Sequence, residues 1–254
     1  MNKLRNFKHV YLIGGSTDIG IKLSNKLILD NCHISNFDIK KPNISSDKYS
    51  FIKCDLSNPK EASDLFSAHM IKQNLNFDQP ACLIFLARSR ELDNKNNLEE
   101  YERILGICLN SAVYISNKFV EITSECSSII YLSSLSSKFI SDESLSYQIS
   151  KSGLNTLSSY IAVNNCKNIR TCTILLGMIV QDRNIKRYES EDNHIYRKKC
   201  EKYQPNNIVG TTNDVVNCIL SIMFYMPDYF NGQEIILDGA ASKVDHFKLA
   251  SKFI

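Results

Sequence analysis

The sequence lacks the usual signs of export, membrane insertion and metal binding. Its opening residues contain no apolar core of a signal peptide. The longest apolar run, residues 218–226, is interrupted by Ser221 and is too short to cross a bilayer. The five histidines show no spacing typical of metal ligands. We therefore expect no membrane segment and no metal site.

Two further absences concern redox state and charge. None of the nine cysteines forms a C-x-x-C motif, and their number is odd. Several fall in apolar patterns, where a free thiol acts as a small buried hydrophobe, so we expect a protein of the reducing cytoplasm. The net charge is only +3, and its basic residues are spread out and balanced by acids. This distribution argues against a nucleic-acid-binding surface.

What the sequence does contain is a regular alternation of short apolar segments with amphipathic ones. No repeat, low-complexity segment or break in composition divides the 254 residues. Such alternation predicts a parallel sheet covered by helices on both faces. We therefore expect an α/β fold, a single doubly wound Rossmann-like domain over residues 1–254 with about seven strands. The expected strands are 9–13, 32–37, 51–54, 82–86, 128–132, 171–175 and 234–237, and the helices are 19–29, 61–72, 99–122 (with a bend), 147–163 and 213–224.

The pattern Tyr-x-x-x-Lys occurs three times, beginning at Tyr49, Tyr114 and Tyr147. Residues four apart share a face only in a helix. Tyr49 begins a segment that predicts a strand, in which residues four apart are about 13 Å apart. Tyr114 falls in a predicted helix, but the residue thirteen before it is Tyr101. Tyr147 has Ser134 at that spacing, and strand, loop and helix N-terminus converge there.

Tyr147 and Lys151, with Ser134 and Asn110, form the candidate catalytic set. A phenol, an ammonium, a hydroxyl and an amide are the groups needed to move a proton while a hydride moves beside it. The alternative interpretation of Tyr147 and Lys151 is an ordinary pair on a helix surface.

A glycine-rich turn, residues 14–20, connects the first strand to the first helix. Small residues let the backbone approach a pyrophosphate, and a helix N-terminus supplies unpaired N–H groups. A tight turn with no ligand is the alternative. Because a carboxylate repels phosphate, we expect Asp18 to be the N-cap, bonded to an N–H two or three residues on. The residues of this turn that are expected to form the cofactor site are Gly14, Ser16, Thr17, Asp18, Ile19 and Gly20.

Asp38 ends the second strand, eighteen residues after Gly20. An acid there can accept both ribose hydroxyls and repels a 2′-phosphate. Thr17 offers no cation to such a phosphate, so NAD is the expected cofactor. Lys40 and Lys41 follow closely and leave NADP open. An acidic turn residue without a ligand is the alternative interpretation of Asp38.

With the glycine loop, the acid and Ser…Tyr-x-x-x-Lys in this order, the chain resembles the single-domain short-chain dehydrogenase/reductase family over nearly its full length. Residues 231–239 match the closing strand of that family. The resemblance implies that Asp55 and Leu56 lie at the adenine, and that the backbone of Ala87 lines the adenosine ribose. It also implies a homodimer or homotetramer.

The sequence departs from the family pattern at three places. The usual Asn-Asn-Ala-Gly is replaced by residues 85–88, Phe-Leu-Ala-Arg, and the usual Pro-Gly is Leu176-Gly177. Gln181 stands where a threonine is usual, and its amide is expected to hold the nicotinamide carboxamide. Ile179, two residues earlier, is also expected to contact the cofactor. None of these departures removes a proton-transfer group.

The mechanism that the resemblance implies uses Tyr147 as general acid/base for a secondary alcohol or ketone. A free phenol titrates near ~10, and the ammonium of Lys151 favours the phenolate. Lys151 also holds the nicotinamide ribose, and Ser134 bonds the substrate oxygen. The alternative is that one of the neighbouring serines, Ser133, Ser136 or Ser137, takes this role. Asn110 positions a water that links Lys151 to solvent.

The substrate region is expected to be basic. Arg88 and Arg90 follow the fourth strand, and Arg183 and Arg187 lie in a long connection, residues 178–209, of the kind that forms substrate lids. If these guanidinium groups bind the substrate, it carries an anionic group, as a sugar nucleotide or an acyl derivative does. A solvated helical surface, balanced by nearby acids, is the alternative.

Two other functional classes stay open. The first is a sugar-nucleotide epimerase or dehydratase with a similar Tyr/Lys pair, although 254 residues leave little room for the extra substrate region of such enzymes. The second is a non-catalytic NAD-binding sensor or scaffold, which the presence of all four candidate catalytic residues disfavours.

Overall fold

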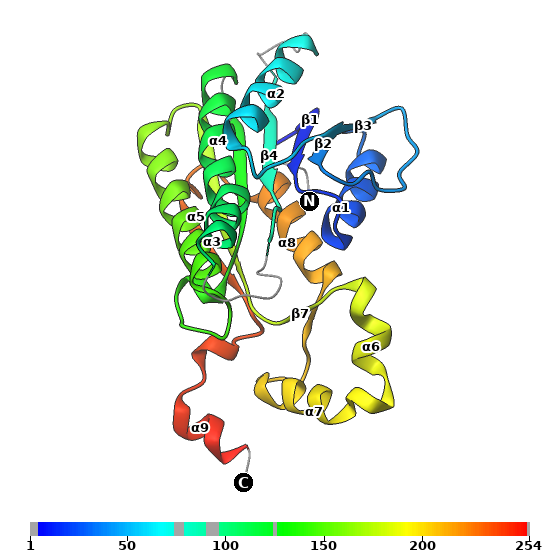
Figure 1. Cartoon of the computed structure of the whole chain (residues 1–254), viewed down its shortest axis with the longest axis vertical. Coiled ribbons are helices and arrows are strands. Elements are labelled where there is room, and N and C mark those ends of the chain that lie inside the picture. The colour runs from blue at the N-terminus through cyan, green and yellow to red at the C-terminus, as the bar shows by residue number, and fades with distance from the viewer. Residues whose placement is uncertain (1–4, 74–78, 90–96, 124–125, 253–254) are drawn as a thin grey trace.

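A parallel sheet of seven strands forms the centre of the fold (Figure 1). The computed structural model describes residues 5–73, 79–89, 97–123 and 126–252. The strand order β3-β2-β1-β4-β5-β6-β9 and the parallel pairing confirm the expected doubly wound sheet. The strands are β1 (His9–Ile13), β2 (His33–Asp38), β3 (Tyr49–Lys53), β4 (Ala81–Phe85), β5 (Ser127–Ser134), β6 (Ile169–Leu176) and β9 (Gln233–Leu237).

Helices cover both faces of the sheet because the strands are apolar on both. In β1, Val10 and Leu12 belong to one core cluster, whereas Tyr11 and Ile13 belong to the other. The first cluster includes α1 (Asp18–Leu29) and α8 (Thr212–Tyr225), and the second includes α2 (Pro59–Lys72), α4 (Ser111–Ile122) and α5 (Leu145–Asn164). Figure 1 shows these two layers on either side of the strands.

The helix expected over residues 99–122 is divided, as the expected bend implies. It consists of α3 (Leu98–Leu105), a π-helical segment (Gly106–Asn110) and α4. The Ser111 N–H donates to the Gly106 carbonyl, five residues back. A π-bulge of this kind inserts one extra residue and redirects the side chains that follow. Asn110 lies at its end.

The long connection after β6 contains more structure than a loop. It begins with β7 (Ile179–Val180), which pairs with β8 (Gly210–Thr211), and a 3₁₀ turn (Asp182–Asn184). Then come α6 (Ile185–Glu189), a second 3₁₀ turn (Glu191–Asn193) and α7 (His194–Tyr203). We call residues 178–209 the lid segment. Figure 1 shows α6 and α7 beyond the carboxyl edge of the sheet, and α9 (His246–Ser251) near the C-terminus.

The cysteines behave as expected for free thiols. All nine are thiols outside any disulfide bond, and six of them are buried. Among the helices of the described residues, none has the length and apolarity needed to cross a membrane.

Candidate active site

A cavity of about 1140 Å³ opens at the carboxyl edge of the sheet, between the strand ends and the lid segment. Parallel α/β sheets bind ligands at this edge, where the strand order reverses. Here the reversal lies between β1 and β4. The sequence-predicted residues that line the cavity are Thr17, Ile19, Arg88, Ser134, Tyr147, Lys151, Ile179, Gln181, Arg183 and Arg187.

The other predicted residues fall into two groups. Arg90 lies outside the described residues. Those that are described but do not line this cavity are Gly14, Ser16, Asp18, Gly20, Asp38, Asp55, Leu56, Ala87 and Asn110. Most of these were assigned to the phosphate and adenosine end of a dinucleotide. Their roles stay predictions.

The glycine loop is packed tightly against the end of β4. Gly14 has φ +76°, and a Cβ there would lie 2.6 Å from Ala87 Cα. Its N–H donates to the Phe37 carbonyl, and the Gly15 N–H donates to Asn36 Oδ1 at 2.9 Å. The start of the loop is therefore bonded to the end of β2, and its contact with phosphate groups stays a prediction.

The expected capping role of Asp18 is wrong. Thr17 is the N-cap of α1: its backbone is extended (φ −92°, ψ 167°) and its hydroxyl accepts from the Gly20 N–H at 3.4 Å. Asp18 is the first residue of the helix, and its carboxylate accepts from the Arg183 N–H at 3.0 Å. The Arg183 Nε lies 3.5 Å from the same oxygen. The lid segment, rather than the helix itself, therefore engages the carboxylate.

Asp38 is bonded to the glycine loop. Its Oδ2 accepts from the Ser16 N–H at 2.9 Å, and its Oδ1 accepts from the Ile39 N–H at 2.7 Å. The buried Asn36 amide donates to Ser16 Oγ and to Tyr49 Oη. The acid therefore sits beside the glycine loop, and its contact with a ribose stays a prediction.

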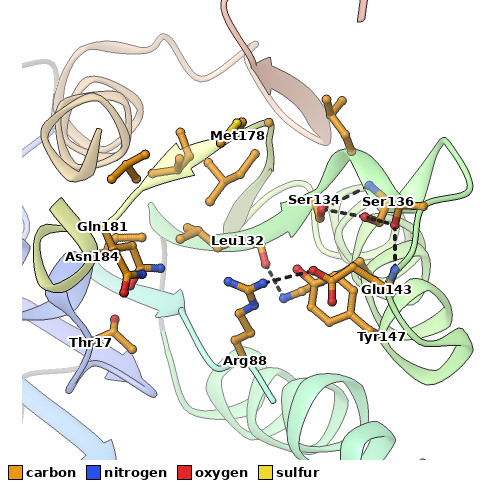
Figure 2. Close-up of a pocket in the computed structure, with 18 of the residues that line it drawn as sticks. Thr17, Arg88, Leu132, Ser134, Ser136, Glu143, Tyr147, Met178, Gln181 and Asn184 are labelled. Atoms are coloured by element: carbon orange, nitrogen blue, oxygen red, sulfur yellow. Dashed lines mark hydrogen bonds and ion pairs between the residues drawn. The ribbon is translucent and has the colours of Figure 1, made fainter. Parts of the chain in front are cut away.

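Tyr147 and Lys151 lie on one face of α5, which begins at Leu145 with Ser144 as its N-cap. Their exposed fractions are 5% and 3%, and both line the cavity. The Lys151 Nζ lies 5.6 Å from the centre of the Tyr147 ring and donates to the Leu132 carbonyl at 2.9 Å (Figure 2). The ammonium therefore stays near the phenol although it is buried.

The other two Tyr-x-x-x-Lys pairs differ as expected. Tyr49 and Lys53 are the two ends of β3. Tyr114 lies on α4 with 48% of its surface exposed, and Lys118 pairs with Glu121. Neither pair lines the cavity.

Ser134 stands in a cluster of four serines, with Ser133, Ser136 and Ser137, and their hydrogen bonds distinguish them. Ser133 donates to the Lys151 carbonyl at 3.0 Å, and Ser137 donates to the Ser134 carbonyl at 2.7 Å. Ser134 Oγ accepts from the Ser136 N–H and donates to Ser136 Oγ, both at 3.2 Å. Ser134 and Ser136 are therefore the serines whose hydroxyls are not committed to a backbone carbonyl, and both line the cavity.

Asn110, Asp55 and Leu56 lie away from this cavity. Asn110 is exposed at the end of the π-helical segment. Asp55 is exposed and accepts from the Ser57 N–H, whereas Leu56 is buried in the second core cluster. The water-positioning and adenine-contacting roles stay predictions for these residues.

Arg88 lies against the ring of Tyr147. Its Cζ is 5.5 Å from the centre of the Tyr147 ring, and its Nη2 is 3.4 Å from Glu143 Oε1. Figure 2 shows the guanidinium pointing toward the Glu143 carboxylate, beside Tyr147, and Arg88 is one of the residues that line the cavity. The next residue, Ser89, donates its N–H to the buried Cys108 Sγ at 3.1 Å. Arg88 thus adds a positive charge at the position of a family glycine.

The lid segment is attached to α1 by two ion pairs. Besides Asp18 with Arg183, Lys22 Nζ lies 2.7 Å from Asp182 Oδ2, which lowers the pKa of Asp182 through the hydrogen bond. Arg183 also donates to Gln181 Oε1 at 2.5 Å, so the amide oxygen of Gln181 already has a partner within the lid segment. Arg187 is exposed at the cavity.

The lid segment also offers an unused hydroxyl. Tyr188 lines the cavity, and its buried Oη has no hydrogen-bond partner among the described residues. Burial raises the pKa of Tyr188 to about 12, so its hydroxyl is protonated at neutral pH. A neutral donor without a partner is suited to a ligand oxygen.

Sequence reasoning missed several residues that shape the site. Asn36 and Cys108 orient the loops that carry Ser16 and Arg88. Glu143 pairs with Arg88 across 55 positions of sequence. Asn36 could have been found from the sequence, because an amide within an apolar strand predicts a buried hydrogen bond. Within the described part of the chain, no group of three or more His, Cys, Asp or Glu residues is placed to hold a metal ion.

Comparisons with known proteins agree with this architecture. A family model described as enoyl-(acyl carrier protein) reductase matches residues 38–241. A 7alpha-hydroxysteroid dehydrogenase from Paraclostridium sordellii is 28% identical over 117 residues, which cover 44% of this chain and 41% of that protein.

Two solved structures share the fold across nearly the whole chain. An aldohexose dehydrogenase from Thermoplasma acidophilum gives a TM-score of 0.80 at 19% identity, over 95% of this chain and 96% of that one. A short-chain dehydrogenase from Leptospira borgpetersenii with bound NAD⁺ gives a TM-score of 0.78 at 20% identity, over 94% of each chain. The sheet order, the glycine loop and the family match lead to one assignment: the chain belongs to the short-chain dehydrogenase/reductase family.

Proposed function

We propose that this chain is an NAD-dependent oxidoreductase that interconverts a secondary alcohol and a ketone, with Tyr147 as general acid/base. One observation carries the proposal: the Tyr147 ring lies buried in the cavity at the carboxyl edge, with Lys151 5.6 Å from its centre. Ser134 lines the same cavity. These are the groups that proton transfer to a carbonyl oxygen requires.

In the proposed reaction, the dinucleotide supplies or accepts the hydride. When an alcohol is oxidised, its carbon loses a hydride and its hydroxyl proton passes to the Tyr147 phenolate. Lys151 stabilises that phenolate by its charge, and the Leu132 carbonyl fixes the ammonium in place. Ser134 donates a hydrogen bond to the substrate oxygen as charge develops there. In the reverse direction the phenol returns its proton to the oxygen.

The test is Tyr147→Phe, with Tyr114→Phe as the matched control. Tyr114 begins another Tyr-x-x-x-Lys pair but lies outside the cavity. We expect Tyr147→Phe to lower kcat by about 10²- to 10⁴-fold, the usual contribution of a general acid/base, and to leave NADH binding within about threefold. Binding is measured by NADH fluorescence, and turnover by NADH oxidation with a panel of ketones. Full turnover by Tyr147→Phe contradicts the assignment, and a protein that binds neither NADH nor NADPH is a scaffold or sensor of another kind.

The preference for NAD is proposed from Asp38. Its carboxylate lies at the glycine loop, bonded to the Ser16 N–H, where a 2′-phosphate would meet a negative charge. The NAD⁺ in the Leptospira relative supports this choice. We expect Asp38→Asn to lower the ratio of the NADPH dissociation constant to the NADH dissociation constant by about tenfold or more. Asp47→Asn, an exposed acid on the following loop, is the control. An unchanged ratio of dissociation constants rules out discrimination by Asp38.

The substrate is proposed to be anionic and to be enclosed by the lid segment. Arg88 and Arg187 line the cavity, as does the unpartnered Tyr188 hydroxyl. We expect Tyr188→Phe to raise KM for the substrate by about 3- to 10-fold with little effect on NADH binding, because one hydrogen bond to the ligand is lost. Tyr229→Phe, 98% exposed and remote from the cavity, is the control.

A homodimer or homotetramer is proposed for the assembly. Helix α5 carries a stripe of exposed apolar residues, Leu145, Ile149, Tyr160 and Val163, at helical spacing. Such a stripe is costly to leave in water and suits a helix–helix interface. Light scattering after size-exclusion chromatography measures the mass, and a monomer at micromolar concentration contradicts the proposal.

A further inference from the structure

We propose that Arg88 binds a carboxylate of the substrate a few bonds from the reacting carbon, so that the substrate is a compact oxo or hydroxy acid. When substrate is absent, the Glu143 carboxylate pairs with the Arg88 guanidinium in its place. The inference rests on the proposed function, which supplies the ketone or alcohol that Tyr147 acts on. It adds a specificity-determining pair, Arg88 and Glu143, at that site.

The position of Arg88 is fixed by its neighbours. Ala87 is 4% exposed and touches the glycine loop at Gly14, and Ser89 is bonded through its N–H to the buried thiol of Cys108. The backbone that carries Arg88 is therefore held on both sides. A guanidinium on a fixed backbone presents its N–H groups in a defined plane, as recognition of a carboxylate requires.

The guanidinium is accessible as well as oriented. Its side chain is 36% exposed, and that of Glu143 is 26% exposed, both at the cavity. A partly exposed ion pair of this kind is weak, about 0–1 kcal/mol. Glu143 already shows that a carboxylate fits beside Arg88 and the tyrosine. Replacing it by a substrate carboxylate preserves the charge balance of the site.

The loop that carries Glu143 is held through its backbone. Its N–H donates to Ser141 Oγ at 3.4 Å, and its carbonyl accepts from Gln148 Nε2 at 2.8 Å. These backbone bonds do not involve the carboxylate. The loop before α5 is therefore held by bonds other than those of the carboxylate.

The location of Arg88 limits the length of the substrate. Its Cζ lies 5.5 Å from the centre of the ring whose hydroxyl bonds the substrate oxygen. A carboxylate on Arg88 and a carbonyl on Tyr147 therefore belong to neighbouring parts of one small molecule, such as a 2-oxo or 3-oxo acid. The lid arginines are arranged differently, because Arg183 is engaged by Asp18 and Gln181. A remote phosphate would need Arg187 instead.

The experiment measures binding without turnover. Isothermal titration of the enzyme saturated with NAD⁺ uses short 2-oxo and 3-oxo acids, each compared with its own ethyl ester, because NAD⁺ cannot reduce a ketone. We expect at least one acid to bind the wild type more tightly than its ester by about 10- to 100-fold, the effect of a bidentate charged pair. Arg88→Gln should remove this preference, and Arg88→Lys should restore only part of it.

Two further variants make the result specific. Glu143→Gln should strengthen binding of the acid by up to about fivefold and leave the ester unchanged, because the competing carboxylate is gone. Lys186→Gln removes an exposed charge of the lid segment that does not line the cavity, and should keep the preference for the acid. Glu143→Gln also tests the proposal if Arg88→Gln fails to fold.

The outcomes separate this inference from the proposed function. No preference for any acid, a preference that survives Arg88→Gln, or one that is lost in Arg187→Gln instead overturns the inference, even if NADH oxidation of neutral ketones still depends on Tyr147. Loss of NADH binding, or full turnover by Tyr147→Phe, overturns the proposed function, and the acid and ester can then still be compared on the protein without NAD⁺.

Discussion

Replacing Gly14 by alanine tests how the glycine loop and the substrate cation are linked. Gly14 has φ +76°, a region that costs an L-residue about 1–2 kcal/mol. The new Cβ would also lie 2.6 Å from Ala87 Cα and 2.8 Å from Ala87 N. Both are backbone atoms of a buried residue, so relief requires the end of β4 to shift, at a cost of about 1–3 kcal/mol. We expect the free energy of unfolding to fall by about 2–5 kcal/mol.

Gly153→Ala is the matched control for this substitution. A Cβ there meets only the Leu109 side chain, at 2.7 Å, and Leu109 can rotate. Gly153 lies inside α5, where alanine gains about 0.5–1 kcal/mol over glycine. We expect a net change below about 1 kcal/mol in urea denaturation. A loss in Gly14→Ala no larger than in Gly153→Ala refutes the reasoning, because strain and close approach would then have no measurable cost.

Three further predictions concern stability. Burial, and secondarily the charge of His33, lowers the pKa of His9 to about 4, so the folded state favours neutral His9. The contribution of His9 to the free energy of unfolding is therefore fully present above pH 6.5 and is lost between pH 6.5 and 4, by about 1–2 kcal/mol after allowing for partial exposure. His9→Gln should flatten this part of the pH profile of urea midpoints. Arg170 is 3% exposed and donates to carbonyls at the end of α8, so Arg170→Met should cost about 2–4 kcal/mol; an unchanged midpoint would mean that these carbonyls find water. Thr211 and Asp214 form a capping box at the start of α8, so Thr211→Ala should cost about 1 kcal/mol and Thr211→Ser almost nothing, as compared by thermal melting.

The elements were predictable because their signals are local. Helix α1 was expected at residues 19–29 and occupies Asp18–Leu29, and β1 has the expected bounds. The apolar period and the flanking glycines suffice for such assignments. The expected strand at Tyr49 is also confirmed, and a strand cannot bring Lys53 to the same place as Tyr49.

Single side chains at an element boundary were harder to predict. Thr17 and Asp18 are both good N-cap residues, and only the backbone conformation decides between them. Thr17 is extended and Asp18 is already helical. Because α1 begins one residue earlier than expected, the Asp18 carboxylate accepts from the lid segment and not from an N–H of its own helix. The lid segment itself was expected as a connection, and its short helices were not assigned, because brief and strongly polar helices give little apolar periodicity.

Contacts between distant parts of the chain have no local signal at all. Asp18 and Arg183 are 165 positions apart, and Arg88 and Glu143 are 55 apart. The charges of all four residues could be seen in the sequence, but their partners follow from the tertiary fold. The sequence therefore indicated a basic substrate region without indicating which arginines already have acidic partners.

The site is best understood as one connected set of contacts. Gly14 approaches Ala87, Ala87 leads into Arg88, and Arg88 lies over the ring of Tyr147. The glycine loop and the proposed carboxylate-binding cation are therefore linked through the backbone of Ala87. An arginine at this family position is tolerated because its side chain points into the cavity and finds Glu143 there, rather than entering the core. It follows that a change at Gly14 should weaken both NADH binding and the preference for an acid over its ester, whereas a change at Arg88 should weaken only the second.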